Sequence, residues 1–270
     1  MSVRPSASVS VRTARPEDAS AIVDVIRAGF EPRLLDLTIY GSARIADWVS
    51  SHLSVPSDAA ERLYSLASDG PAVVGCAELA QRADHLFLSY ISVLPSHRRV
   101  GVGGLLLGDA VRGASSPNQP MLRLDVLAGN AIASAWYRDL GFQRTGTTIV
   151  CDASDTLPEP RISARVSGLP AANAAHAAFG FSDFQIETDR SGRTTVGRLG
   201  DRWWRLVPRS DTEMEVFDDR DLLSTLRALE PHRGLLITLN STSAPAGVVE
   251  ILRTHRMEIE IDPLLERLPA

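Results

Sequence analysis

The sequence predicts an α/β (α+β) fold: a mixed, mostly antiparallel seven-stranded sheet with helices on both faces, followed by a smaller second α/β domain. Segments with strand-like alternation and segments with helical periodicity follow one another along the chain. Of the 270 residues, 44% are hydrophobic, which is enough for a sizeable core. The length suits one large domain or two modest ones. We expect a loose tail at 1–9, a first domain at 10–168 and a second domain at 169–270.

The first domain is predicted to begin with a short strand and a helix. Pro16, followed by the acidic Glu17 and Asp18, is typical of a first helical turn. Asp69 and Gly70 are typical of a tight turn between two antiparallel strands. Helices are expected at 16–29, 42–53, 103–113 and 130–140. Strands are expected at 9–13, 62–67, 72–79, 85–94, 121–127, 143–152 and 161–167.

The second domain is predicted to repeat this order of elements without the glycine-rich loop of the first. Strands are expected at 184–188, 195–199, 203–207, 213–217, 235–239 and 257–261. Helices are expected at 170–179, 222–229 and 246–254. The order suggests either a degenerate second copy of the first domain or an unrelated α+β cap. Trp203 and Trp204 are interpreted as core or interface residues rather than as residues that stack on a ligand.

The composition excludes several classes of protein. The net charge is −5 and every basic residue is Arg, so no general nucleic-acid-binding surface is expected. Cys76 and Cys151 form neither a disulfide framework nor a zinc pattern, and we expect no metal. No apolar run has the length of a signal peptide or a membrane span. These observations favour a soluble cytoplasmic protein, a monomer or homodimer, with no nucleic-acid or membrane partner.

A glycine-rich loop in the middle of the first domain is the strongest local motif. Arg98, Gly101 and Gly103 follow the spacing R-x-x-G-x-G between an expected strand and an expected helix. Backbone N–H groups at a helix N-terminus lack intrahelical acceptors, and together with the helix dipole they favour a phosphate. A side chain at either glycine would hold such a ligand away from the backbone. The alternative is an ordinary tight strand-to-helix connection, since neither a G-x-G-x-x-G nor a Walker pattern is present.

The loop and the segment after it together resemble the GNAT superfamily of acyl-CoA-dependent N-acyltransferases. The matching motifs are V-x-P-x-x-R-x-x-G-x-G at Val93 to Gly103, N-x-x-A at Asn130 to Ala133, and W-Y-x-x-L-G-F at Trp136 to Phe142. The opening Val11 to Ile26 is also similar to the family's first strand and helix. The resemblance covers 10–168 and implies the family's mixed sheet. It also suggests that the second domain is a degenerate copy, as in tandem members.

The resemblance implies acetyl-CoA as co-substrate and a set of residues that contact it. The loop amides would bind its diphosphate, with Arg98 complementing the charge. The pantetheine arm would lie like a strand beside the fourth strand, against main-chain groups. For Asn130, capping of the following helix is the alternative to a pantetheine contact. The full set of expected contacts is Ile91, Ser92, Val93, Arg98, Arg99, Val100, Gly101, Val102, Gly103, Gly104 and Asn130.

Two residues are candidates for the chemistry of acyl transfer. The resemblance places Tyr137 as the general acid that protonates the departing thiolate; a core aromatic on the helix is its alternative. Asp125 stands where some family members carry a Glu that acts as general base, often through a water. Alternation puts Asp125 and Arg123 on one face of their strand, so an ion pair with Arg123 or another Arg is the alternative. His85 and His97 are expected to be exposed and not catalytic.

The predicted activity is transfer of an acetyl group from acetyl-CoA to a primary amine of a small molecule, by direct attack in a ternary complex. In the resembling family, the second helical region borders the acceptor cleft, and the second domain could close that cleft. Alternatives are acetylation of a protein or peptide, which needs an open groove beside 153–160, and a non-catalytic acyl-CoA sensor. Candidate acceptor contacts, each also explicable by helix packing, are Arg33, Tyr40, Arg44 and Trp48.

Overall fold

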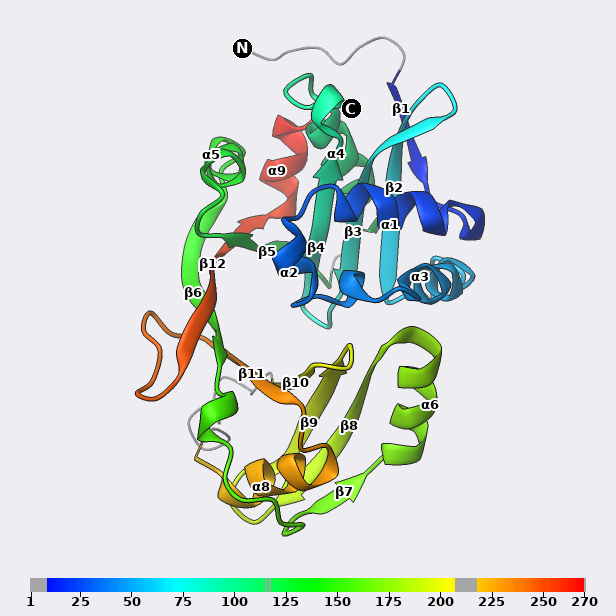
Figure 1. The fold of residues 1–270 in the computed structure, drawn as a ribbon. Helices are drawn as coiled ribbons and strands as arrows, with labels where there is room; N and C mark the ends of the chain where they lie inside the picture. The colour runs from blue at the N-terminus through cyan, green and yellow to red at the C-terminus, as the bar shows by residue number, and fades with distance from the viewer. Residues whose placement is uncertain (1–8, 115, 117, 207–217, 270) are drawn as a thin grey trace.

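The structure is a computed structural model that describes residues 9–114, 116, 118–206 and 218–269. Within these residues, twelve strands form one continuous sheet (Figure 1). The strands are β1 (Val9–Thr13), β2 (Arg62–Asp69), β3 (Ala72–Gln81), β4 (His85–Val93), β5 (Met121–Leu127), β6 (Gln143–Asp152), β7 (Arg165–Ser167), β8 (Phe181–Thr188), β9 (Gly192–Leu199), β10 (Trp203–Leu206), β11 (Gly234–Leu239) and β12 (Val249–Glu260). Their order across the sheet is β1-β2-β3-β4-β5-β12-β6-β11-β10-β9-β8-β7.

The helices connect neighbouring strands and cover the sheet. The α-helices of the described residues are α1 (Ala19–Arg27), α2 (Pro32–Leu35), α3 (Ile45–Leu53), α4 (Val102–Ala114), α5 (Ala131–Asp139), α6 (Leu169–Phe179), α8 (Arg220–Leu229) and α9 (Ile261–Arg267). The 3-10 helices are η1 (Pro16–Asp18), η2 (Ile39–Gly41), η3 (Pro95–His97) and η4 (Ser154–Thr156). In the described part of the chain, no helix is long and apolar enough to cross a membrane.

The predicted elements of the first half are confirmed from β1 to β6, with shifts of a few residues at their ends. Gly70 adopts a φ of +57° in the turn between β2 and β3, a conformation that favours glycine. Alternation along β5 places Leu122, Leu124 and Val126 in the core and their neighbours on the other face. Of the predicted tail at 1–9, Val9 begins β1 and the rest lies outside the described residues.

The predicted seventh strand of the first domain, at 161–167, is wrong. Only Arg165–Ser167 forms a strand, β7, which pairs with β8 at the far edge of the sheet. The residues before it run along α8, where the amide of Arg161 donates to Ser224 O and that of Ser163 donates to Thr225 Oγ1. The amides of Arg161 and Ser163 are therefore bonded to α8 and not to a neighbouring strand.

The strand that completes the first half of the sheet is β12, which comes from the C-terminal part of the chain. It lies between β5 and β6 and pairs antiparallel with both. The predicted helix at 246–254 is therefore wrong, and the predicted strand at 257–261 is the end of one long strand. Met257 and Ile259 of β12 enter the core of the first half, which explains the strand's position. The sheet thus has twelve strands in the described chain, not seven plus a separate set.

The second half repeats the first around the β12–β6 pair. The parallel pair β4–β5 corresponds to β10–β11, and the antiparallel pair β5–β12 corresponds to β11–β6. A helix, α5, joins β5 to β6, whereas the described residues 240–248 between β11 and β12 contain no helix. Three features of the second half lie outside the described residues: the predicted strand at 213–217, the last residue of the predicted strand at 203–207, and the position that corresponds to the glycine-rich loop.

The two halves share the continuous sheet, through β6, β12 and β11 (Figure 1). The segment before α3 also contacts the end of α6, where Ser42 Oγ donates to Phe179 O and Arg44 donates to Ala177 O. Trp48 of α3 meets Phe181 of β8 edge to face at 5.5 Å, and Leu37 and Ile39 pack against an apolar cluster of the second half. These contacts hold the second half against the face of the first half that carries α1, α2 and α3.

Candidate active site

The loop between β4 and α4 has the geometry of an anion-binding site. Arg99 and Gly101 both have positive φ, at +63° and +90°, so the backbone turns sharply twice before α4 begins. Gly101 O accepts the amides of Gly104 and Leu105 at 3.1 and 3.2 Å. Across the described residues, no backbone or side-chain acceptor contacts the amides from Val100 to Gly103. These N–H groups without acceptors lie at the N-terminus of a 13-residue helix, where the backbone donors and the helix dipole favour binding of an anion.

The glycines of this loop differ in what the structure requires at each position. Gly101 needs its positive φ. A Cβ on Gly103 would lie 3.5 Å from the Trp136 ring, and one on Gly104 would lie 3.4 Å from Pro269. Both distances are ordinary van der Waals contacts, so packing leaves room for a methyl group at either position.

The strands β4 and β5 separate beside this loop. They pair only from His85 to Leu88 of β4, opposite Met121 to Leu124 of β5. The amide of Leu94 donates to Val74 O at 2.8 Å, which fixes the alternation of β4 against β3. By that alternation the peptide groups of Ile91 and Val93 point away from β3 into the gap. The geometry fits the predicted main-chain contacts of these two residues with an extended ligand arm.

Ser92, also predicted to contact the co-substrate, is oriented differently from Ile91 and Val93. The same alternation turns its peptide groups toward β3, and its buried hydroxyl donates to Val25 O at 2.7 Å. Arg98, by contrast, lies at the gap: its Nε donates to Val93 O at 2.7 Å while its side chain is exposed. It thus connects the loop to the gap, and its Nη groups contact no acceptor within the described chain.

Tyr137 lies on α5 with its ring in the core of the first half. It is 6% exposed and packs against Trp136 and Phe142, with ring centroids 4.9 and 5.3 Å away. Its hydroxyl has no hydrogen-bond partner among the residues that the structure describes, and burial raises the pKa of the phenol well above its ordinary value of about 10. At the start of the same helix, Asn130 Oδ1 accepts the amide of Ala133 at 3.0 Å, which confirms the capping alternative for Asn130.

Asp125 forms an ion pair rather than facing solvent freely. Its two oxygens accept Nε and Nη2 of Arg256 at 2.9 and 3.0 Å, and Arg256 stands directly opposite on β12. Arg123, the partner considered from the sequence, instead pairs with Glu258 at 3.0 Å. With both oxygens held in this fork, the structure favours the ion-pair alternative over a general base.

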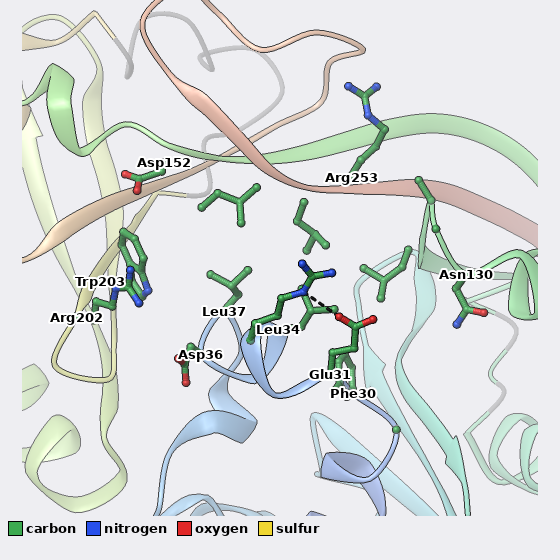
Figure 2. Close-up of a pocket in the computed structure, with 17 residues that line it drawn as sticks. Phe30, Glu31, Leu34, Asp36, Leu37, Asn130, Asp152, Arg202, Trp203 and Arg253 are labelled. Carbon is green, nitrogen blue, oxygen red and sulfur yellow. Dashed lines mark hydrogen bonds and ion pairs between the residues drawn. The ribbon is translucent and has the colours of Figure 1, made fainter. Parts of the chain in front are cut away.

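A cavity of about 680 Å³ lies between the two halves (Figure 2). Its lining includes the end of β5 and Gly29, which lies against Ser92 of β4. Elements of both halves line it: the segment around α2, the end of β5, the end of β6, β12 and the turn before β10. Of the four predicted acceptor contacts, Arg33 lines it. Residues not predicted for the site line it as well: Gly29, Phe30, Glu31, Leu34, Asp36, Leu37, Asp152, Arg202, Trp203 and Arg253.

The other three predicted acceptor contacts have structural roles. Tyr40 is fully buried and its hydroxyl donates to Glu78 at 2.6 Å. Trp48 packs against Phe181 at the contact between the halves. Arg44 binds the C-terminal turn of α6 and lines a second, smaller cavity of about 530 Å³. Helix and interface packing therefore accounts for Tyr40 and Trp48.

Most charges around the larger cavity are paired. Glu31 and Arg33 form an ion pair at 2.8 Å, and Arg253 Nε donates to Glu250 at 2.8 Å. Asp152 Oδ1 accepts the amide of Ser154 at 2.9 Å. The charged residues Asp36 and Arg202 line the same cavity, and neither takes part in an ion pair within the described residues.

The remaining candidate residues lie away from the cavity. His97 bonds Asp69 at 3.2 Å and His85 bonds Asp84 at 2.7 Å, and both histidines are only partly exposed. Cys76 and Cys151 are buried, and burial raises the pKa of both thiols. No cluster of His, Cys, Asp or Glu that could hold a metal occurs among the described residues.

Comparison with known proteins agrees with this geometry. Residues 33–142 match the model of the acetyltransferase (GNAT) family. A GCN5-related N-acetyltransferase from Sphaerobacter thermophilus is similar over 95% of this chain and 97% of its own, at 15% identity and a TM-score of 0.64. A tandem GNAT protein from the clavulanic acid biosynthesis pathway is similar over 94% and 98%, at 14% identity and a TM-score of 0.62.

A putative acetyltransferase from Pyrococcus horikoshii is similar over 94% of this chain and 90% of its own, at 14% identity and a TM-score of 0.61. At these identities the solved structures establish the fold, including its arrangement in two halves. A search of the curated proteins finds no match to the chain.

Proposed function

We propose that the protein is an N-acetyltransferase, on the premise that residues 33–142 match the model of the acetyltransferase (GNAT) family. It would transfer an acetyl group from acetyl-CoA to a primary amine of a small molecule, in a ternary complex. One observation carries the proposal: the loop at the N-terminus of α4 has backbone amides without acceptors among the described residues, and it follows β4 where β4 and β5 separate. The end of β5 on the other side of this gap lines the cavity between the halves.

The residues present fit acetyl-CoA, which would supply the acetyl group as a thioester. The amides of Val100 to Gly103 would bind the diphosphate, and Arg98 would complement its charge. Arg99 contributes through its left-handed backbone, and Gly104 through the first turn of α4. The peptide groups of Ile91 and Val93 would bind the pantetheine amides, as an added strand would.

Tyr137 would hold the proton that the leaving thiolate takes up. Its phenol is kept neutral by burial, and its hydroxyl has no competing partner in the described residues. With Asp125 held by Arg256, we assign loss of the amine's proton to water in the cavity. In this division Tyr137 is the proposed general acid.

The second half lines one side of the cavity, which favours a small acceptor. Asp152, Arg202 and Trp203 stand where an open groove beside 153–160 would be needed for a protein substrate. In Figure 2 they face the segment around α2 across the cavity. Acetylation of an extended peptide is therefore the weaker alternative. A non-catalytic acyl-CoA sensor would have no need of a cavity of about 680 Å³ beside the gap.

The test combines calorimetry with coenzyme A and a mass-spectrometric assay of acetyl transfer to a panel of small amines. We expect coenzyme A to bind and at least one amine to be acetylated. In Tyr137→Phe we expect unchanged coenzyme A affinity and a kcat lower by about 100-fold or more, as for loss of a general acid. Absence of binding, or binding without transfer to any amine, would contradict the proposed function.

A further inference from the structure

The cavity between the halves has two chemically different ends (Figure 2). Asn130 and the end of β5 stand at one end, beside the β4–β5 gap where the thioester would lie. Arg202, on the turn before β10, and Trp203, the first residue of β10, lie toward the other end. The carboxylates Asp36 and Asp152 lie on the same side of the cavity, and the hydroxyl and amide of Ser154 already donate to Asp152. An acceptor whose amine reaches the gap therefore presents its remote end to the second half.

Arg202 is held in place without a counter-ion. Its guanidinium carbon lies 4.5 Å from the centre of the Trp203 ring, which favours a stacked, oriented guanidinium. Trp203 is itself only 5% exposed and belongs to a small apolar cluster with Leu199 and Leu236. Through the described chain, no carboxylate lies within ion-pair distance of Arg202.

Among the arginines that line this cavity, Arg202 is the one that forms no ion pair within the described residues, so its charge is free to bind an anion. Arg33 is neutralised by Glu31 and Arg253 by Glu250. The buried Nε1 of Trp203, in the same wall, is a donor without an acceptor among the described residues. A planar guanidinium with free N–H groups matches a carboxylate through two parallel hydrogen bonds.

We propose that the second half selects the acceptor, and that Arg202, oriented by Trp203, binds a carboxylate on the end of the acceptor remote from the reacting amine. The acceptor class is then an amine that also carries a carboxylate, such as an amino acid. The inference rests on the proposed function, because it concerns the acceptor of that reaction. Arg202 and Trp203 are specificity-determining residues in this account.

The test uses the full chain and matched acceptors. Acetyl transfer is measured with glycine, β-alanine, 4-aminobutanoate and 5-aminopentanoate, each beside its carboxamide and beside a diamine of equal length. We expect kcat/KM for at least one aminocarboxylate to exceed that of its carboxamide by about tenfold or more, as for a hydrogen-bonded charge pair. Arg202→Gln should lower kcat/KM for that carboxylate at least about tenfold more than for its carboxamide.

Two further variants make the result specific. Arg202→Lys keeps the charge but loses the fork, so it should retain part of the preference. Arg165→Gln, an exposed arginine on β7 of the same half, should keep the wild-type preference, and thermal melts verify that all variants fold. Any of three results would overturn this inference alone: transfer that shows no preference for carboxylates, a preference for diamines, or an effect of Arg202→Gln that is equal for the carboxylate and its carboxamide. Absence of transfer to every amine would overturn it together with the proposed function.

Discussion

The phenol of Tyr137 lies in an apolar site, and the pH dependence of the reaction should reveal it. Burial disfavours the phenolate and raises the pKa of Tyr137 well above about 10. A general acid fails as pH rises through its pKa, so a raised pKa moves the alkaline loss of kcat upward. We predict that kcat under saturating substrates shows no fall up to about pH 10. A mass-spectrometric rate profile, corrected for uncatalysed transfer, measures this; a fall centred near pH 8 would exclude Tyr137 as the acid.

Gly101 and Gly103 offer a matched pair of substitutions in one loop. Gly101→Ala places a side chain at φ +90°, which costs roughly 1–2 kcal/mol, and it should weaken coenzyme A binding by distorting the amides. Gly103→Ala puts a methyl group at ordinary contact distance, 3.5 Å, from Trp136 and should change stability by less than about 0.5 kcal/mol. Urea unfolding and calorimetry with coenzyme A compare the two variants.

The larger Gly103→Val adds methyl groups toward the Trp136 ring, so we expect it to lower coenzyme A affinity through displacement of α5. Equal affinity in Gly101→Ala, Gly103→Val and wild type would show that this loop is only a connection.

Asp125 and Arg256 form a pair whose role a double-mutant cycle can decide. As an ion pair between partly buried side chains, they should show a coupling energy of about 1 kcal/mol in unfolding experiments. Asp125→Asn and Arg256→Gln should then have similar, modest effects on kcat. If Asp125→Asn alone lowered kcat by about 100-fold or more, Asp125 would be the general base after all.

At the scale of single residues, the sequence predicted what local motifs determine. The R-x-x-G-x-G spacing and the aromatic motif on α5 led to the loop amides and to Tyr137. Ser92 differs from Ile91 and Val93 because the direction of a peptide group in a strand depends on its pairing, here with β3, which a local motif cannot reveal. Arg202 and Asp152 were missed because no local pattern brings the ends of β9 and β6 to the same cavity as α2.

At the scale of elements, α9 is the helix that the sequence did not predict. Its short run of residues follows a strand that was itself split into a helix and a strand. Leu264 on α9 is fully buried in the core of the first half, and Leu268 and Pro269 lie against Gly104 on α4. The helix therefore supports the first turn of α4, whose amides face the proposed diphosphate site.

We predict that Leu264→Ala lowers the free energy of unfolding by about 2–4 kcal/mol, because it leaves a cavity in that core. Glu266→Ala, exposed on the same helix, is the matched control and should change it by less than about 0.5 kcal/mol. Chemical denaturation of the three proteins gives these values. A similar small change in both variants would mean that α9 is only loosely attached.

The errors at this scale share one cause. The segment 246–260 contains apolar and charged residues that suit a helix face locally, yet Arg256 and Glu258 pair with Asp125 and Arg123 across the sheet. Such partners lie more than a hundred residues away, as their separations of 131 and 135 show, so a window of neighbouring residues cannot reveal them. Elements with local turns and caps, such as β2–β3 and α5, were predicted well.

At the scale of the whole molecule, the sheet continues across the predicted domain boundary between residues 168 and 169, which remains a prediction. β12, beyond the boundary, pairs with β5 and β6, which lie before it. We predict that residues 10–168 alone form no cooperative domain, because both β5 and β6 would have an unpaired edge. Thermal melts of 10–168, of the full chain and of 10–168 co-expressed with 169–270 test this.

We expect a cooperative melt only in the latter two samples. If 10–168 alone melted cooperatively and bound coenzyme A, β12 would be an accessory strand. The same experiment separates the two readings of the second half: a unit needed for folding, or a cap that only lines the cavity.

The position of β12 has a consequence for the making of the protein. During translation β12 emerges after every other strand of the sheet, yet its place is between two strands that emerged long before. The nascent chain therefore carries two open strand edges from the synthesis of β6, which ends at Asp152, until that of β12, which begins at Val249. Such edges invite pairing with other chains. Newly made molecules should depend on chaperones until that last strand has inserted, and ribosomes that stop early should yield aggregates rather than half-sized enzymes.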